Sequence, residues 1–232
     1  MHFAPLGDRA LMVTLGDAID EPTNRLVRAA SVRLDETAPP GVVDIVPAFA
    51  SIAVHYDPAL VRGDVGEPPY DRLVRELRSV LKDLRDDALP APRTVEVPVC
   101  YGGDLGPDLE DVARQHGLDS DTVIRIHAAG DYLVYMVGFM PGFAYLGGLA
   151  EQIVTPRRSS PRTAVPAGTV GIGGRQTGVY PLVSPGGWNL IGRTPLRVFD
   201  AARETPSLLE TGDRVRFRPI TRRDFDAWPA PS

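Results

Sequence analysis

Lysine and cysteine are almost missing from this chain of 232 residues. Lys82 is the only lysine and Cys100 the only cysteine. A Walker A loop, a Schiff-base lysine or a covalent biotin would each have to use Lys82, which lies in a run of helical spacing without the required motif. One cysteine excludes an intramolecular disulfide, a cysteine-rich zinc site and an iron–sulfur cluster. The sequence therefore predicts no covalent biotin on this chain, and a cytoplasmic location fits best.

Positive charge and uninterrupted hydrophobic runs are also scarce. The formal net charge is −5 and the isoelectric point is near 5.4, so we expect no general binding to nucleic acid or to an anionic membrane. The uncharged run from Tyr132 to Ala150 is interrupted by Pro141 and by four glycines, which argues against a spanning helix. No basic segment followed by a long apolar one opens the sequence, so no signal peptide is expected.

Glycine and proline, by contrast, are abundant. The 23 glycines and 23 prolines make about a fifth of the chain, against roughly 12% in an average soluble protein. This excess excludes a helical bundle and favours a turn-rich β protein. The segment from Gly138 to Pro195 alone holds 12 glycines and 7 prolines in 58 residues, which predicts a tightly turned β-barrel there.

The amino-terminal part has a different pattern, in which helices alternate with strands. Apolar residues recur at helical spacing between Tyr70 and Leu84, and a second helix is predicted from about Thr23 to Glu36. Strands are predicted at 10–15, 42–46 and 51–56. Because the prolines within 86–93 suggest a linker, we expect a small α+β sandwich domain at 1–89 and a β-barrel domain at 94–226.

Cationic side chains are concentrated in the same glycine-rich segment. Five arginines stand there against one acid, so the segment carries a formal charge of +4 in an acidic protein. Arginines beside glycine-rich backbone suit the recognition of a carboxylate or a phosphate. The alternative is that they are solvated, or that they hold loops to acidic segments or to a partner. The arginines are Arg157, Arg158, Arg162, Arg175 and Arg193, and the acid is Glu151.

Two motifs of this segment each leave two interpretations open. The loop GIGGRQTG at 171–178 has Gln176 where a dinucleotide fingerprint needs glycine, so it predicts either an anion-binding nest of backbone N–H groups or a plain turn. Trp188 follows two glycines and can wall a pocket, with Asn189 and Arg193 as hydrogen-bonding groups, or it can pack in a core. The same choice applies to Phe143 and Tyr145.

The four histidines show no metal-ligand spacing, so no metal site is expected. His127 comes at the end of a predicted helix that begins near Ser120. It is the best acid–base candidate of the four, and the alternative is a structural cap of that helix. No G-x-S-x-G elbow is present, so a serine-triad hydrolase has no support in the sequence.

Seven motifs spread over the chain are distinctive together. They are GDRAL at 7–11, GVVDIVP at 41–47, VPVCYGG at 97–103, GFMPGFAYL at 138–146, VPAGTV at 165–170, QTGVYP at 176–181 and SPGGWNLIGRTP at 184–195. In these motifs the chain resembles the family of 5-oxoprolinase B subunits, which is also labelled allophanate hydrolase subunit 1 and includes a Kip-type inhibitor of a sporulation histidine kinase. The chain departs from the family at Gly171 and Gly173, where alanines are usual.

The resemblance implies a fold, a reaction and partners. The fold is an α+β amino-terminal domain followed by an all-β, cyclophilin-like barrel. The reaction is the ATP-dependent opening of a cyclic amide, 5-oxo-L-proline, to L-glutamate by a cytoplasmic heteromer. ATP, with Mg²⁺, is bound by the complex or by one of the partner proteins. The partners are a C subunit, which is KipA-like and also called allophanate hydrolase subunit 2, and a LamB/YcsF-like A subunit.

Under this hypothesis the catalytic candidate is His127, and arginines stabilise charge on a transferred phosphoryl group. The candidate substrate- and anion-binding residues are Arg157, Arg158, Arg162, Gln176, Tyr180, Trp188, Asn189 and Arg193. Two alternatives stay open. One is a carboxyltransferase or allophanate hydrolase-type subunit of a urea–amide pathway, with biotin carried on another protein. The other is a non-enzymatic inhibitor of a histidine kinase.

Overall fold

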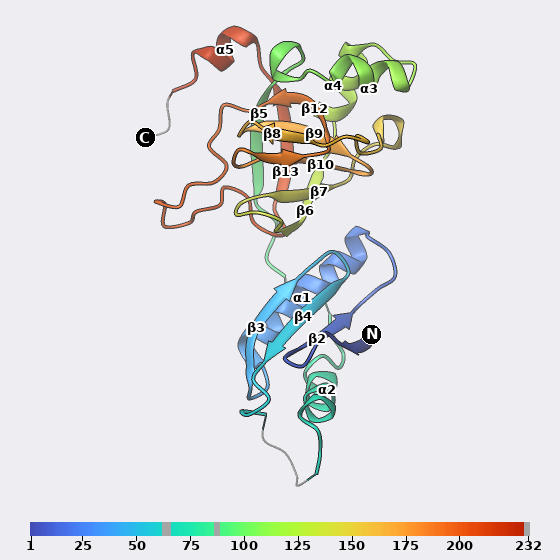
Figure 1. The fold of residues 1–232 in the computed structure, drawn as a ribbon, viewed down its shortest axis with the longest axis vertical. Coiled ribbons are helices and arrows are strands. Elements are labelled where there is room, and N and C mark those ends of the chain that lie inside the picture. The colour runs from blue at the N-terminus through green and yellow to red at the C-terminus, as the bar shows by residue number, and fades with distance from the viewer. Residues whose placement is uncertain (62–65, 86–88, 230–232) are drawn as a thin grey trace. The chain divides into compact units, whose positions relative to one another are not determined.

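The computed structural model describes residues 1–61, 66–85 and 89–229, and its contacts divide the chain into two compact units, Met1–Ala91 and Pro92–Ser232 (Figure 1). The first unit contains β1 (His2–Pro5), β2 (Ala10–Thr14), α1 (Glu21–Thr37), β3 (Val42–Pro47), β4 (Ser51–Tyr56) and α2 (Pro69–Val80). The second contains β5 (Thr94–Tyr101), η1 (Gly103–Leu105), α3 (Leu109–Gln115), α4 (Ser120–Ala128), β6 (Tyr132–Val137), β7 (Ala144–Gly147), η2 (Glu151–Ile153), β8 (Arg162–Val165), β9 (Thr169–Gly173), β10 (Gln176–Val179), β11 (Ser184–Gly186), β12 (Asn189–Arg193), β13 (Arg214–Pro219) and α5 (Arg222–Asp226).

The first unit is an antiparallel sheet packed on two helices. The strand order is β1-β2-β4-β3. Alternate residues of the strands, such as Leu11 and Ile52, are fully buried against the apolar stripes of α1 and α2, represented by Leu34 and Leu73. The side chain of Asp20 accepts a hydrogen bond from the backbone N–H of Thr23 at 2.8 Å, and this cap fixes where α1 begins.

The second unit is a closed seven-stranded barrel in the order β10-β7-β6-β13-β5-β12-β9. Strand β13 runs parallel to β5, and the other neighbouring strands of the barrel are antiparallel. Fully buried aliphatic side chains, among them Val97, Val134, Ile172 and Val215, fill its interior. The short strands β8 and β11 pair with each other outside the barrel. The short, glycine-rich strands therefore close into one core instead of stacking as layers.

Most of the predicted elements are confirmed. Strand β4 has the predicted bounds, α1 extends slightly beyond them, and α2 ends at Val80 instead of continuing to Leu84. In the glycine-rich segment β10 ends at Val179, and β11 begins at Ser184. Loop 171–178 is the β9–β10 hairpin, in which Gly173 pairs with Gln176, so the plain-turn interpretation holds.

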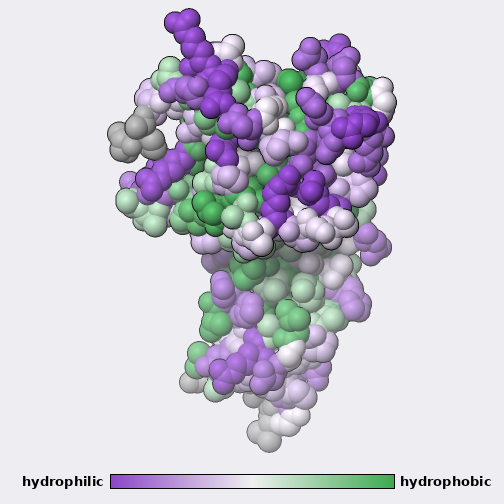
Figure 2. Space-filling view, turned by 45° about the horizontal axis from the view of Figure 1, so that its top comes forward, coloured by the Kyte–Doolittle hydropathy of each residue, from purple (hydrophilic) through white to green (hydrophobic). Residues whose placement is uncertain are grey.

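The predicted barrel is confirmed as a closed barrel accompanied by a separate sheet and helices. The domain boundaries 1–89 and 94–226 stay a prediction, and residues 86–88 of the expected linker lie outside the described residues. In the described parts of the chain, no helix is long and apolar enough to cross a membrane. On the face shown in Figure 2, hydrophilic and hydrophobic residues are interspersed.

Candidate functional site

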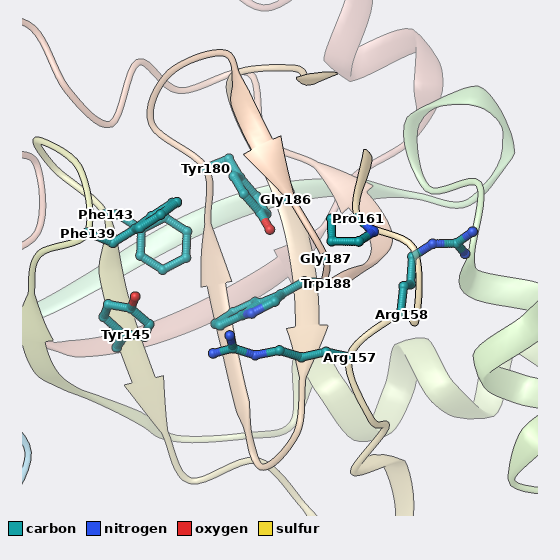
Figure 3. Close-up of a pocket in the computed structure, with 10 residues that line it drawn as sticks. All are labelled: Phe139, Phe143, Tyr145, Arg157, Arg158, Pro161, Tyr180, Gly186, Gly187 and Trp188. Carbon is teal, nitrogen blue, oxygen red and sulfur yellow. The ribbon is translucent and has the colours of Figure 1, made fainter. Parts of the chain in front are cut away.

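A pocket of about 190 Å³ opens on the second unit, between an aromatic cluster and an arginine-bearing loop (Figure 3). The aromatic side comes from the β6–β7 turn, from β7, from the end of β10 and from the residue before β12. The loop side comes from the segment between η2 and β8, and from the last residue of β11 and the glycine that follows it. The lining residues are Phe139, Phe143, Tyr145, Arg157, Arg158, Pro161, Tyr180, Gly186, Gly187 and Trp188.

The aromatic rings pack edge to face around Phe143. Its ring centroid lies 4.8 Å from that of Tyr145, 5.3 Å from Tyr180 and 5.5 Å from Trp188. Phe143, Tyr180 and Trp188 are each less than 5% exposed, whereas Phe139 is 67% exposed at the mouth. Edge-to-face contacts hold the rings in fixed orientations, so the pocket has a rigid apolar wall.

Glycines make room for these rings. A β-carbon at Gly173 would collide with the indole of Trp188, and one at Gly178 would lie 3.1 Å from the same ring. At Gly186 a β-carbon would lie 2.5 Å from the hydroxyl of Tyr180. The glycine excess that the sequence shows in this segment therefore has a local cause, the close approach of strand backbone to large aromatic side chains.

Arg157 brings a positive charge to the aromatic wall. Its guanidinium carbon lies 5.9 Å from the centroid of the Trp188 ring, at the outer range of a cation–π contact. Burial raises the pKa of the Tyr145 hydroxyl, and the charge of Arg157 acts in the opposite direction. Burial also raises the pKa of Tyr180, against the backbone hydrogen bond from Trp188 and the charge of Arg157. Both phenols are therefore neutral at physiological pH.

Arg158 and Arg162 are held by a carboxylate that was not among the residues predicted from the sequence. Nη1 of Arg158 and Nη2 of Arg162 donate to Oδ1 of Asp108 at 3.1 and 2.7 Å. In Figure 3 the guanidinium of Arg158 points away from the aromatic rings, so it is mainly the stem of this side chain that lines the pocket. Asp108 is 3% exposed. Arg157 is thus the pocket arginine whose charge faces the rings.

Asn189 fixes the arginine-bearing loop rather than lining the cavity. Its side-chain amide donates to the carbonyl of Pro156 at 2.9 Å and to that of Ile172 at 3.2 Å. The backbone N–H of Arg158 donates to the carbonyl of Gly187 at 2.8 Å. The residues on either side of Arg157 are therefore bonded to the segment that carries Trp188.

Two other predicted residues do not line the pocket. Gln176 begins β10 at the hairpin, and its side-chain nitrogen is buried without a partner. Arg193 ends β12, whereas Trp188 directly precedes that strand, so the two lie toward opposite ends of β12. Burial lowers the pKa of Arg193, against the charge of nearby Asp104. The structure brings together Arg157, Arg158, Tyr180 and Trp188 of the predicted set, and leaves Gln176 and Arg193 apart.

The catalytic candidate His127 lies in the barrel core and not at the pocket. It is fully buried, and its ring stacks on Phe217 with centroids 4.6 Å apart. Nε2 lies 2.9 Å from Oγ1 of Thr177, whose hydroxyl donates to the Gly171 carbonyl, so Nε2 carries the proton. Nδ1 then accepts from the hydroxyl of Tyr101 at 2.7 Å. Burial lowers the pKa of His127 to about 3, so the ring is neutral and fully hydrogen-bonded.

The arrangement is suited to binding a small molecule. Among the described residues, no group of three or more histidine, cysteine, aspartate or glutamate side chains is placed to hold a metal ion. A rigid aromatic wall with one guanidinium over it fits a small, flat molecule that carries a carboxylate. The sequence signal for the wall was the GFMPGFAYL and SPGGW motifs. The only sequence signal that could have pointed to Asp108 is its position in the GPDL motif at 106–109.

Comparisons with known proteins find matches that cover most of the chain. The family model for the carboxyltransferase domain, subdomain C and D, matches residues 1–209. The B subunit of 5-oxoprolinase from Bacillus subtilis (strain 168) is 45% identical over 226 residues, which make 96% of this chain and 94% of that protein. The protein of the same name from Escherichia coli O157:H7 is 44% identical over 92% of this chain and 94% of its own length.

More distant and longer relatives contain a similar module. The crystal structure of TTHA0988 matches with a TM-score of 0.78 at 38% identity, over 97% of this chain and 41% of that one. This chain thus spans less than half the length of that solved relative. The urea amidolyase of Saccharomyces cerevisiae is 28% identical over 53% of this chain, and only 7% of its own length is covered.

Proposed function

Since the chain belongs to the carboxyltransferase-domain subdomain C and D family, we propose that it is the B subunit of an ATP-dependent 5-oxoprolinase, which opens 5-oxo-L-proline to L-glutamate. The proposal is supported by three curated relatives that are named as B subunits of 5-oxoprolinase, at 39–45% identity over nearly the full chain. The urea amidolyase relatives are more distant and match about half of the chain, so they give less support to a urea–amide reaction.

The observation that carries the proposal is the pocket itself. 5-Oxo-L-proline is a small five-membered lactam with one carboxylate. Phe143, Tyr145 and Trp188 offer a rigid apolar wall for the ring, and Arg157 offers a guanidinium for the carboxylate. A charge-assisted contact of this kind contributes roughly 1.5–3 kcal/mol. The chain thus binds and orients the lactam and excludes water from one face of its ring.

The pocket is poorly suited to ATP. A triphosphate needs several free donors, but the pocket presents one guanidinium, and the amide of Gly174 in the glycine-rich hairpin already donates to the Thr155 carbonyl at 2.8 Å. The nucleotide and its Mg²⁺ are therefore assigned to a partner protein. ATP hydrolysis supplies the driving force for breaking a stable amide bond, and this chain contributes recognition of the lactam.

The heteromer is part of the proposal. We assign a C subunit, of the KipA-like or allophanate hydrolase subunit 2 type, and a LamB/YcsF-like A subunit as partners, in the cytoplasm. A relative that contains a similar module within a chain more than twice as long is consistent with such an assembly. The two compact units are proposed to fold as separate domains, an α+β domain and a cyclophilin-like barrel.

Reconstitution of the three proteins tests the proposal. The complete mixture should form glutamate from 5-oxo-L-proline only when ATP is present, and each protein on its own should not. Arg157→Gln should raise KM about tenfold or more, because it removes the charge that faces the substrate carboxylate. Arg175→Gln is the matched control, since that arginine is exposed, pairs with Glu151 and does not line the pocket. Absence of ATP-dependent glutamate in the complete mixture refutes the proposal.

A further inference from the structure

Asp108 occupies a helix-cap position without acting as a cap. It directly precedes α3, where an aspartate side chain usually accepts a hydrogen bond from the first turn, but its carboxylate makes no such bond. The residue is 3% exposed. Its carboxylate is instead turned to two other segments of the barrel unit, although the local sequence favours the cap. Local stability of α3 therefore does not explain its orientation.

The carboxylate joins the two segments that carry the pocket. Oδ1 accepts from the guanidinium groups of Arg158 and Arg162. Oδ2 accepts from the backbone N–H of Leu190 at 2.7 Å, and the Leu190 carbonyl accepts from the backbone N–H of Asp108 at 2.9 Å. Arg158 is the residue after Arg157, and Leu190 lies two residues after Trp188. One buried carboxylate thus contacts both of the segments that carry the Arg157–Trp188 pair.

We propose that Asp108 is a positioning residue that sets the Arg157–Trp188 pair and thereby the affinity of the pocket for a small carboxylate. The role as a substrate site rests on the proposed function, whereas the positioning of the pair does not. Asp108 acts in two ways. It ties the arginine-bearing loop to β12, and its negative charge holds the guanidinium groups of Arg158 and Arg162. The Arg158 guanidinium therefore points away from the aromatic rings, and Arg157 is the pocket arginine that faces the ligand.

The substitution Asp108→Asn tests the charge of this side chain separately from its size. Asp108→Asn keeps the size of the side chain and an oxygen for the Leu190 N–H, but it places an uncharged amide against two guanidinium groups. Those groups lose their common anion, and charge-assisted bonds are roughly twice as strong as neutral ones. The loop is then held to β12 by fewer and weaker bonds, so Arg157 no longer stays over the Trp188 ring.

The geometry of the pair is measurable without substrate. The chain has two tryptophans, so a Trp228→Phe background leaves Trp188 as the only indole. In that background Asp108→Asn should increase acrylamide quenching of Trp188 fluorescence at least twofold, because the loop no longer shields the ring. Asp213→Asn is the matched control: Asp213 is also buried, accepts from Arg93 and from a backbone N–H, and does not line the pocket. It should leave the quenching unchanged.

Kinetics of the reconstituted complex distinguish a loss of Arg157 positioning from a general loss of structure. Asp108→Asn should raise KM for 5-oxo-L-proline about tenfold with kcat within about twofold, and should add little to KM in an Arg157→Gln background, since both changes remove the same contact. A drop in kcat with unchanged KM, or fully additive effects, overturns the proposal. Unchanged quenching overturns it even if the complex has no oxoprolinase activity. If Asp108→Asn fails to fold by circular dichroism, the double variant Arg158→Gln/Arg162→Gln should give the same quenching increase, and its absence is equally decisive.

Discussion

Acidification should destabilise the barrel unit through His127. The neutral imidazole is buried, and its pKa is lowered by burial to about 3, whereas in the unfolded chain it is close to 6.5. The unfolded state therefore binds a proton that the folded state does not, throughout the range between these two values. The stability contributed by the neutral histidine is fully present above pH 6.5 and is lost progressively as the pH falls toward 3.

The magnitude follows from proton linkage. Each pH unit between the two values changes the free energy of unfolding by about 1.4 kcal/mol, so lowering the pH from about 7 to about 5 should cost about 2 kcal/mol from His127 alone. His127→Gln removes the titrating group and keeps a side chain that can both donate and accept, toward Thr177 and Tyr101. The variant should be less stable at neutral pH, but its stability should fall less on acidification.

Urea unfolding at about pH 7 and about pH 5, followed by tryptophan fluorescence, measures this difference. The wild type should lose about 2 kcal/mol more than His127→Gln between the two conditions. Equal losses in both proteins would refute the assignment of His127 as a neutral core residue. In the reconstituted complex, a bell-shaped rate profile whose acidic limb disappears in His127→Gln would instead support the acid–base role that the sequence suggested.

Three further outcomes follow from the packing and the pocket. Gly173→Ala should destabilise the barrel by about 1–3 kcal/mol and raise KM, because the new methyl group collides with Trp188; thermal melting and kinetics measure the two effects. Arg157→Lys keeps the charge but loses the planar group over Trp188, so KM should rise less than in Arg157→Gln, and equal values would contradict a stacked guanidinium. Leu73→Ala removes a fully buried side chain from the first unit and should lower the free energy of unfolding of that unit by about 2–5 kcal/mol. If the two units unfold independently, calorimetry should show one transition at a lower temperature and one unchanged. If they unfold together, it should show a single transition at a lower temperature.

Local patterns in the sequence were sufficient to predict the helices and many of the strands. The stripe of α2 and the alternation of β4 each follow from contacts between residues that are close along the chain. Strand β13 was not predicted from the sequence. Its arginines at 214, 216 and 218 give it little apolar content, and its partner β5 lies more than a hundred residues earlier in the chain. Pairing across such distances leaves no local signal.

The sequence predicted several of the residues that line the pocket, but it did not predict which arginine faces the aromatic rings. Arg157 and Arg158 are adjacent and chemically identical, yet one faces the rings and the other turns to Asp108. That choice depends on a carboxylate fifty residues earlier in the chain, which composition cannot reveal. His127 was selected for its type and its place near a helix end, but burial is set by the whole barrel, and burial is what removes its charge.

The parallel pair of β5 and β13 has a consequence for synthesis of the protein. Strand β13 is the last of the seven barrel strands to leave the ribosome, and it fits between β5 and β6, which are made much earlier. Until it arrives, the nascent barrel exposes two unpaired strand edges, the feature that most readily recruits other chains into aggregates. Nonsense mutations upstream of Arg214 should therefore yield insoluble fragments rather than a smaller working barrel, and solubility on truncation would report how late the barrel closes.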